Sequence, residues 1–229
     1  MATVQQAPAD QRFLLFNVSW KTYETFLAEL GDRPIRLTYD RGNLELMAPS
    51  HVHERYKKIL GRIIDTLTLE LNILMKSGGS TTFKRKDLER GMEPDECYYI
   101  ENEPLVRGKM EIDLTTDPPP DICIEIDITS SSLDRQGIYA AMRVPEIWRF
   151  DGESLRVYRL DANGDYQLCD RSPTFPFLPL DEIARFLQQA NVADETSLIR
   201  AFITWLREEI VPRLQDGRAR DNPGPSANS

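Results

Sequence analysis

The stretch DICIEIDITSSSLDRQGIY, residues 121–139, decides the fold. Every second residue from 122 to 128 is isoleucine, and this strict alternation predicts a β-strand. Successive side chains of a strand point to opposite faces, so Glu125 and Asp127 share the face away from the isoleucines, roughly 7 Å apart. Asp and Glu are poor strand residues. Two acids side by side in such a strand therefore indicate a site, unless that face of the sheet is simply solvated.

The segments around this strand alternate between strand and helix patterns. Ser19 is expected to cap a helix over residues 20–30 that ends at Gly31. Apolar residues at helical spacing predict a long amphipathic helix over 50–75. The other expected elements are a strand at 11–19, a hairpin at 35–49, a strand, turn and strand within 80–102, a helix at 131–144, a meander at 145–169 and helices within 175–210.

This pattern predicts one mixed α/β domain with additions at both ends. We expect a flexible N-terminus over residues 1–11, the domain over 12–190, a helical extension over 191–214 and a disordered tail over 215–229.

The composition is that of an ordinary globular chain of 229 residues, 41% hydrophobic and 28% charged. Three cysteines without CxxC spacing argue against disulfides and zinc, and favour the cytoplasm. We expect no membrane partner, because no apolar run approaches ~18 residues. A net charge of -9 argues mildly against a protein that lives on duplex DNA, but a carboxylate cluster that needs a cation would also make the charge negative.

Two strand-like segments begin with Pro-Asp, namely EPDECYYI at 93–100 and PPDICIEIDI at 119–128. If they are sheet neighbours, Asp95 and Glu125 meet on one surface, and their mutual repulsion should raise at least one of the two pKa values. Mg²⁺ prefers oxygen ligands and is often held by one or two carboxylates together with substrate phosphates. The two segments therefore predict a metal site.

Three longer segments, YDRGNLELMAPSHVHERYKKIL, EPDECYYI and DPPPDICIEIDITSSSLDRQGIYAAMRVPEIWRFDGESLRVYRL, carry a family resemblance. Over about residues 12–190 the chain resembles the Uma-two family of restriction endonucleases, within the PD-(D/E)xK nuclease superfamily. The resemblance implies a restriction-endonuclease-like fold, with a mixed central sheet flanked by helices. It also implies a metal held by Asp95 and, 30 positions later, Glu125.

The chain departs from the family pattern where the motif has lysine, because this position is Asp127. In the family that the chain resembles, many members supply a basic residue from the following helix, about four positions before its tyrosine. Here that residue is Arg135. Arginine can orient water or stabilise charge, but it stays protonated and is no general base.

Glu45 is the first choice for an additional metal ligand, since such nucleases often use an acid from this N-terminal region; the alternative puts Glu45 on an outer sheet face. His53 and Glu54 could instead form a pair at the start of the long helix, with favourable contacts to the helix dipole.

The leading hypothesis is a metal-dependent endonuclease that hydrolyses phosphodiester bonds. Its cofactor would be Mg²⁺ or Mn²⁺, and its partner nucleic acid, DNA before RNA; a homodimer is left open. Asp95, Glu125, Asp127 and Arg135 would be catalytic, and Asp95, Glu125 and Glu45 would bind the metal. The alternative is a nuclease-fold protein with impaired chemistry that acts as a nucleic-acid-binding or protein-interaction module. Asp127, Arg135 and the net charge favour that alternative.

Overall fold

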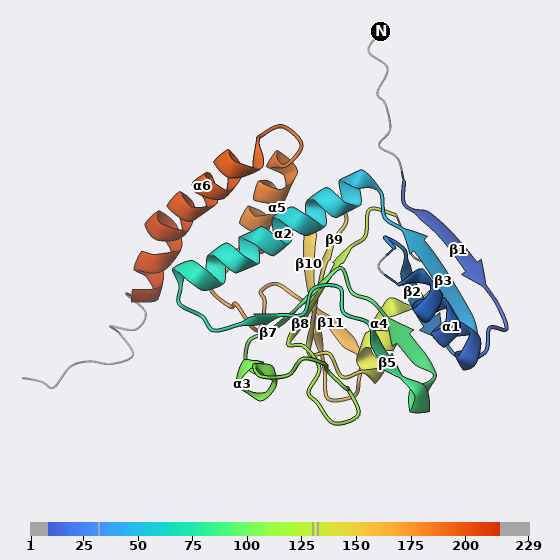
Figure 1. Ribbon diagram of the computed structural model, residues 1–229. Coiled ribbons are helices and arrows are strands. Elements are labelled where there is room, and N and C mark those ends of the chain that lie inside the picture. The colour runs from blue at the N-terminus through green and yellow to red at the C-terminus, as the bar shows by residue number, and fades with distance from the viewer. Residues whose placement is uncertain (1–8, 32, 130, 132, 216–229) are drawn as a thin grey trace, which may run out of the picture.

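The computed structural model describes residues 9–31, 33–129, 131 and 133–215 (Figure 1). Most of the predicted flexible N-terminus and all of the predicted tail after residue 215 lie outside the described residues, as do Ser130 and Ser132. Within the described part of the chain, no helix is long and apolar enough to cross a membrane.

The strand predicted from the isoleucine alternation is β8 (Ile122–Ile126), and it lies inside a six-stranded sheet. β8 runs parallel to β9 (Glu146–Phe150) and antiparallel to β7 (Glu96–Tyr99). The predicted meander is confirmed, since β9 pairs with β10 (Leu155–Leu160) and β10 with β11 (Tyr166–Cys169), both antiparallel. The two-residue strand β4 (Lys76–Ser77) closes the other edge. The predicted fold class, a mixed sheet flanked by helices, is thereby confirmed.

A second, five-stranded antiparallel sheet stands beside the first and has the order β1-β3-β2-β6-β5. Its strands are β1 (Gln11–Leu15), β2 (Arg36–Asp40), β3 (Asn43–Ala48), β5 (Phe83–Arg85) and β6 (Arg90–Met92). β2 and β3 form the predicted hairpin. The predicted helix over 20–30 is α1 (Trp20–Leu30), whose cap Ser19 accepts a hydrogen bond from the Thr22 amide. The sequence pattern did not separate the strands into two sheets.

The long helix α2 (His51–Glu70) ends five residues before the predicted end at Met75. Asn72 adopts a left-handed conformation with φ 53°, and the Ile73 amide bonds the Thr68 carbonyl, which together terminate the helix. The apolar spacing continued to Leu74, but that side chain is 64% exposed and takes no part in the buried stripe.

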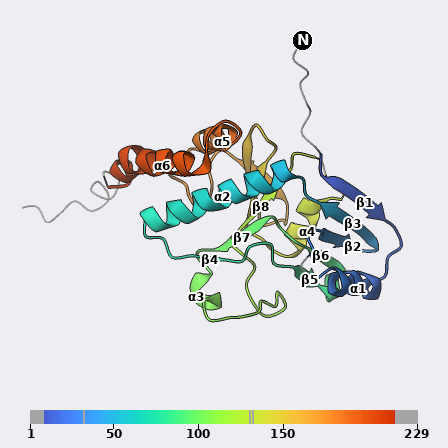
Figure 2. The same ribbon diagram turned by 45° about the horizontal axis from the view of Figure 1, so that its top comes forward.

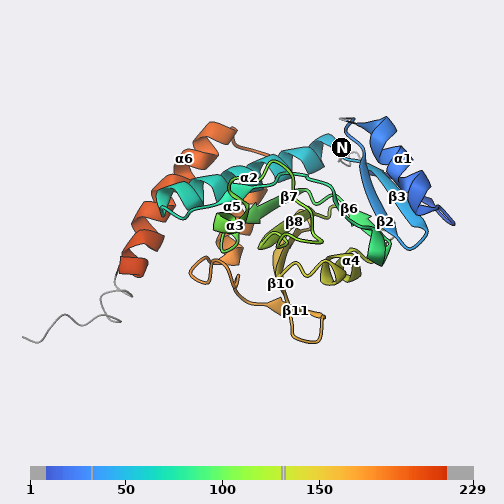
Figure 3. The same ribbon diagram turned by 60° about the horizontal axis from the view of Figure 1, so that its bottom comes forward.

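Helices cover both faces of the six-stranded sheet. On the isoleucine face, α2 packs on β8 and α5 (Leu180–Gln189) on β10, while α6 (Glu195–Trp205) lies against α2 (Figures 1 and 2). The chain continues from α6 into a π-helical turn, η2 (Leu206–Ile210). On the opposite face, α4 (Arg135–Ala141) packs beside β6 (Figure 3). The alternative that a solvated face explains the acids is therefore wrong for Glu125, which is buried with Cys123, whereas Asp127 beyond the end of β8 is half-buried. Two short helices were not predicted, η1 (Lys86–Leu88) and α3 (Glu103–Val106).

The approach of β6 to α1 gives a sharp test of the packing of the second sheet. A Cβ atom added at Gly91 would lie 2.1 Å from the Tyr23 hydroxyl oxygen. Tyr23 is fully buried and stacked on Tyr39, so it has little room to move. We expect Gly91→Ala to lower the free energy of unfolding by about 1–3 kcal/mol, as overpacking does. Urea unfolding measures this, and Gly108→Ala, where the added Cβ meets nothing within 4 Å, is the matched control. Equal stability of the two variants would contradict the packing.

Candidate functional site

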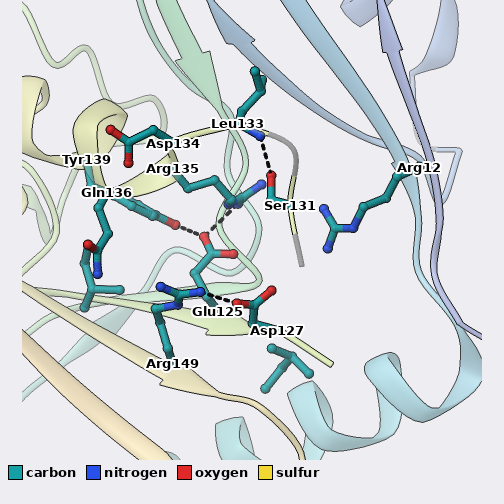
Figure 4. A pocket seen from close by; sticks show the side chains of 12 residues that line it. Arg12, Glu125, Asp127, Ser131, Leu133, Asp134, Arg135, Gln136, Tyr139 and Arg149 are labelled. Atoms are coloured by element: carbon teal, nitrogen blue, oxygen red, sulfur yellow. Dashed lines mark hydrogen bonds and ion pairs between the residues drawn. The ribbon is translucent and has the colours of Figure 1, made fainter. Parts of the chain in front are cut away.

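A cavity of about 150 Å³ opens beside the C-terminal end of β8, where the two sheets approach each other (Figure 4). Charged side chains of both signs line it, including Arg12, Glu125, Asp127, Arg135 and Arg149. The cavity therefore combines three of the four predicted catalytic residues with two arginines that the sequence patterns did not single out.

Two side chains of the short helix α4 donate hydrogen bonds to the Glu125 carboxylate. Arg135 donates to Glu125 Oε1 at 2.7 Å, and the Tyr139 hydroxyl donates to the same oxygen. Asp134 caps α4 by accepting from the Gly137 amide, which fixes the start of this short helix. Arg135 and Tyr139 are four positions apart, so they lie on one helical face and reach the same carboxylate.

Arg135 also ties the two sheets together. Its guanidinium donates to the Thr38 hydroxyl of β2 at 2.7 Å and to the Glu93 carbonyl at 3.1 Å. Burial raises the pKa of Glu125, and the negative charge of Asp95 raises it further, while Arg135 and Tyr139 act in the opposite direction. The pKa of Glu125 is thus raised as expected for one of the two acids, but burial contributes more to the rise than the expected repulsion from Asp95.

Asp127 lies one residue beyond the end of β8, and its amide donates to the Phe150 carbonyl at 2.7 Å. Its carboxylate forms an ion pair with Arg149, which lies on β9 opposite Glu125. Asp127, which occupies the motif's lysine position, therefore pairs with a further arginine of the cavity wall, Arg149.

Asp95 directly precedes β7, and the register Glu96↔Ile124 puts it opposite Glu125 on the neighbouring strand. The Ile126 amide donates to Asp95 Oδ2 at 2.6 Å, and Arg36 donates to Oδ1. The side chain is 1% exposed, and Asp95 is not among the residues that line the cavity. The two predicted acids are thus adjacent in the sheet, but each has its own arginine.

His53 connects Asp95 to a further acid. Its Nε2 lies 2.8 Å from Asp95 Oδ1 and its Nδ1 lies 3.1 Å from Asp10 Oδ2. Burial by itself would lower the pKa of His53, but hydrogen bonds and the charges of Asp10 and Asp95 raise it to about 9. Burial likewise would raise the pKa of Asp95, but the hydrogen bond from His53, the charge of Arg36 and the Ile126 amide lower it to about 2. His53 therefore bridges two carboxylates as an imidazolium.

Sequence reasoning missed this bridge, although a signal existed. A cationic side chain is unfavourable beside the positive N-terminus of a helix. A histidine in the first turn of α2 that is nevertheless charged needs acidic partners, and here they are Asp10 and Asp95. Glu54 lies in the first turn of α2, where the dipole favours an acid, and it also accepts a hydrogen bond from Arg36 at 3.0 Å.

Glu45 lies on β3 and is 1% exposed, so the alternative of an outer sheet face is wrong. Its Oε1 accepts from Arg12 at 2.9 Å and from the Ser131 hydroxyl at 3.0 Å. Both donors line the cavity, which connects Glu45 to the site through them.

The three acids predicted as metal ligands do not form a ready-made cage. In the described part of the chain, no three or more His, Cys, Asp or Glu residues gather so that they could hold a metal ion. The set Asp95, Glu125 and Glu45 stays a prediction, and in the structure each of these acids has an arginine partner. Mg²⁺ commonly takes one or two carboxylates and completes its shell with water and substrate phosphates, and Asp95 and Glu125 supply two carboxylates on neighbouring strands.

The raised pKa of His53 predicts a pH-dependent stability. A histidine whose folded pKa exceeds its unfolded value of 6.5 stabilises the fold fully below pH 6.5 and loses that contribution as pH rises toward about 9. Because a tenfold change in proton affinity corresponds to ~1.4 kcal/mol, the expected loss is about 3 kcal/mol. Urea unfolding at pH 6.5 and 9 measures it. His53→Gln should lack this part of the pH dependence, and an identical decline in both proteins would contradict the bridge.

The two sheets flanked by helices give the chain a fold of the restriction-endonuclease-like class. The model of the Uma2 family, described as "Putative restriction endonuclease", matches residues 20–193, and the chain belongs to this family. Family membership supports a nuclease role. A search of curated proteins found no match.

Among solved structures, the chain is similar to the crystal structure of "a putative nuclease belonging to DUF820" from Anabaena variabilis. The two share 18% identity, with a TM-score of 0.48, over 66% of this chain and 90% of that chain.

Proposed function

We propose that the protein is a metal-dependent endonuclease that hydrolyses phosphodiester bonds of nucleic acid, with Mg²⁺ or Mn²⁺ as the ion and DNA as the first substrate to test. One observation carries the proposal. Asp95 and Glu125 lie opposite each other on neighbouring strands, and Arg135 reaches Glu125 at the wall of a charged cavity. The family supports the nuclease role, and these residues suggest how the chain performs it.

Asp95 and Glu125 would hold the cation, with water and phosphate oxygens in its remaining positions. A cation bound there polarises a phosphoryl oxygen and lowers the pKa of its water. Arg135 would stabilise the negative charge that develops on the phosphate, since its planar fork matches phosphate oxygens. Tyr139 orients Glu125 through its hydrogen bond, and Asp127 holds Arg149 at the cavity wall.

A cation at this pair would compete with the arginines that now hold the two carboxylates, and exchange of a basic partner is one way to admit it. Arg36 now neutralises Asp95, and Arg135 neutralises Glu125. Arginine does not deprotonate, so the exchange must occur by movement of a side chain. A substrate phosphate favours this exchange because it offers Arg135 a new anionic acceptor. We therefore expect stronger cation binding in the presence of nucleic acid than in its absence.

The same two ion pairs favour a second candidate function, nucleic-acid binding without cleavage. A buried acid that is already neutralised by arginine needs no cation to be stable in the fold. In that case nucleic acid would bind equally well with and without a divalent ion.

Cleavage assays separate the two functions. Supercoiled plasmid, linear duplex DNA, single-stranded DNA and RNA are incubated with the protein in Mg²⁺, in Mn²⁺ and in EDTA. We expect nicked or linear plasmid only with a divalent ion. Glu125→Gln should remove the activity, while the exposed Glu208→Gln, which loses the same charge far from the site, should keep it. If no substrate is cut under any condition but binding is equal in EDTA, the second function replaces the first.

A further inference from the structure

Arg12 reaches the candidate site from outside the family-matched residues. It lies on β1, the edge strand of the five-stranded sheet, whereas the family model begins at residue 20. The side chain is only 13% exposed and lines the same cavity as Arg135. Figure 4 shows its guanidinium directed from β1 toward the side of the cavity where Ser131 and Glu125 lie.

Five described side chains have a buried polar atom without a hydrogen-bond partner, those of Trp20, Tyr23, Tyr99, Arg12 and Arg135, and of these five only the two arginines line this cavity. In each, the buried Nε has no hydrogen-bond partner among the described residues. A buried N–H without an acceptor is destabilising, and folded proteins satisfy nearly all such groups. One of these donors belongs to strand β1 and the other to helix α4. These elements are far apart in the sequence, but both arginines line the same cavity. Their common position indicates an acceptor that comes from outside the chain.

The cavity defines what that acceptor can be. Its volume of about 150 Å³ is below the ~300–1,000 Å³ of pockets for drug-sized ligands, so it suits one small group. Two guanidinium groups demand an anion with several acceptor oxygens, and phosphate meets this geometry with paired hydrogen bonds. Glu45, Glu125 and Asp127 already pair with Arg12, Arg135 and Arg149, so the two free Nε donors are left for an acceptor that enters the cavity.

We propose that Arg12 is a phosphate-binding residue and that it clamps one backbone phosphate of a nucleic acid together with Arg135. The edge strand β1 is then part of the substrate site. This inference rests on the proposed nucleic-acid substrate, but it does not depend on cleavage.

Salt-dependent binding tests the clamp without requiring activity. Fluorescence anisotropy in EDTA follows labelled duplex DNA, single-stranded DNA and duplex RNA over a series of salt concentrations. Each phosphate contact contributes about 0.9 to the slope of log affinity against log salt for duplex DNA. Arg12→Ala should weaken binding and reduce the slope by about 0.9. Arg12→Lys should keep the slope, since its charge remains, while Arg12→Gln should lose it. Arg200→Ala, an exposed arginine on α6, is the matched control.

The outcomes separate this inference from the proposed function. If the wild type cuts DNA but Arg12→Ala and Arg12→Gln both bind with wild-type affinity and slope, the clamp is overturned and the nuclease stands. If the wild type cuts nothing while the slope falls in both variants, the clamp stands and cleavage is overturned. A merely structural Arg12 would lower the urea midpoint and leave the slope of the folded variants unchanged, which also overturns the clamp. Absence of wild-type binding to all three nucleic acids would do the same.

Discussion

Replacement of Asp95 by asparagine is expected to lower the free energy of unfolding by about 3–5 kcal/mol, the range for breaking a buried ion pair from one side. Arg36 and His53 both donate to Asp95 Oδ1, and the Ile126 amide donates to Oδ2. Asparagine removes the buried charge that pairs with Arg36 and His53, leaves Arg36 with the half-exposed Glu54 as its ion-pair partner, and lacks an acceptor at one of the two positions. The lowered pKa of Asp95 also predicts a loss of stability for Asp95→Asn, because it means that the fold stabilises the ionised carboxylate at neutral pH.

Urea unfolding at pH 7 measures this loss, with Glu125→Gln as the matched acid-to-amide control. The pKa of Glu125 is raised, so the fold does not favour its charged form. Arg135 also keeps Thr38 and the Glu93 carbonyl as acceptors. We therefore expect a clearly smaller loss for Glu125→Gln. Clustered carboxylates considered alone predict the opposite, since removing one charge would relieve repulsion. Unchanged stability of Asp95→Asn would restore that simpler explanation.

Replacement of Arg135 by alanine is expected to lower the rate of nucleic-acid cleavage by about 10²–10³-fold, the range for removing one preorganised donor to a developing anion. Arg135→Lys should retain part of the activity, because the charge survives while the paired hydrogen bonds do not. This prediction rests on the proposed nuclease activity. Initial rates on plasmid DNA in Mg²⁺ and Mn²⁺ measure it.

The Arg135 variants need a stability control, because the side chain links both sheets through Thr38 and Glu125. Cleavage is therefore compared at a temperature where the near-ultraviolet circular dichroism of each variant matches the wild type. Arg200→Ala serves as the reference for loss of an exposed arginine. If the wild type cuts DNA and folded Arg135→Ala cuts equally fast, Arg135 has no part in the chemistry.

Local patterns predicted those parts of the fold that depend on neighbours in the sequence. The isoleucine alternation gave β8, and Ser19 with its following apolar stripe gave α1. The adjacency of Asp95 and Glu125 was predicted on the condition that the two Pro-Asp segments are sheet neighbours, and the antiparallel register of β7 and β8 aligns them. Periodicity failed at the end of α2, where the left-handed Asn72 outweighs a stripe that continues in the sequence.

The partners of the acids were beyond the reach of such patterns. His53 and Asp10 are 43 positions apart, and Arg36 and Asp95 are 59 apart. Neither spacing carries a periodic signal, because the contacts form only when the second sheet stands against the first. Arg12 pairs with Glu45 across 33 positions, a contact within the second sheet that depends on the pairing of β1 with β3. The division of the strands into two sheets is thus the step that sequence patterns lacked, and it determines which basic residue meets which acid.

The position of β1 at a sheet edge determines what would happen to a protein shortened to the family-matched residues 20–193. Such trimming removes β1 and α6 together. β3 would then present the main-chain groups that now pair with β1, a row that can template association with a second chain. Loss of α6 would uncover apolar side chains of α2 and α5 that now face Phe202 in the core. We expect the shortened protein to aggregate during expression, so a poor yield of residues 20–193 would reflect a broken sheet edge and an uncovered helix layer, with no bearing on the chemistry of the site.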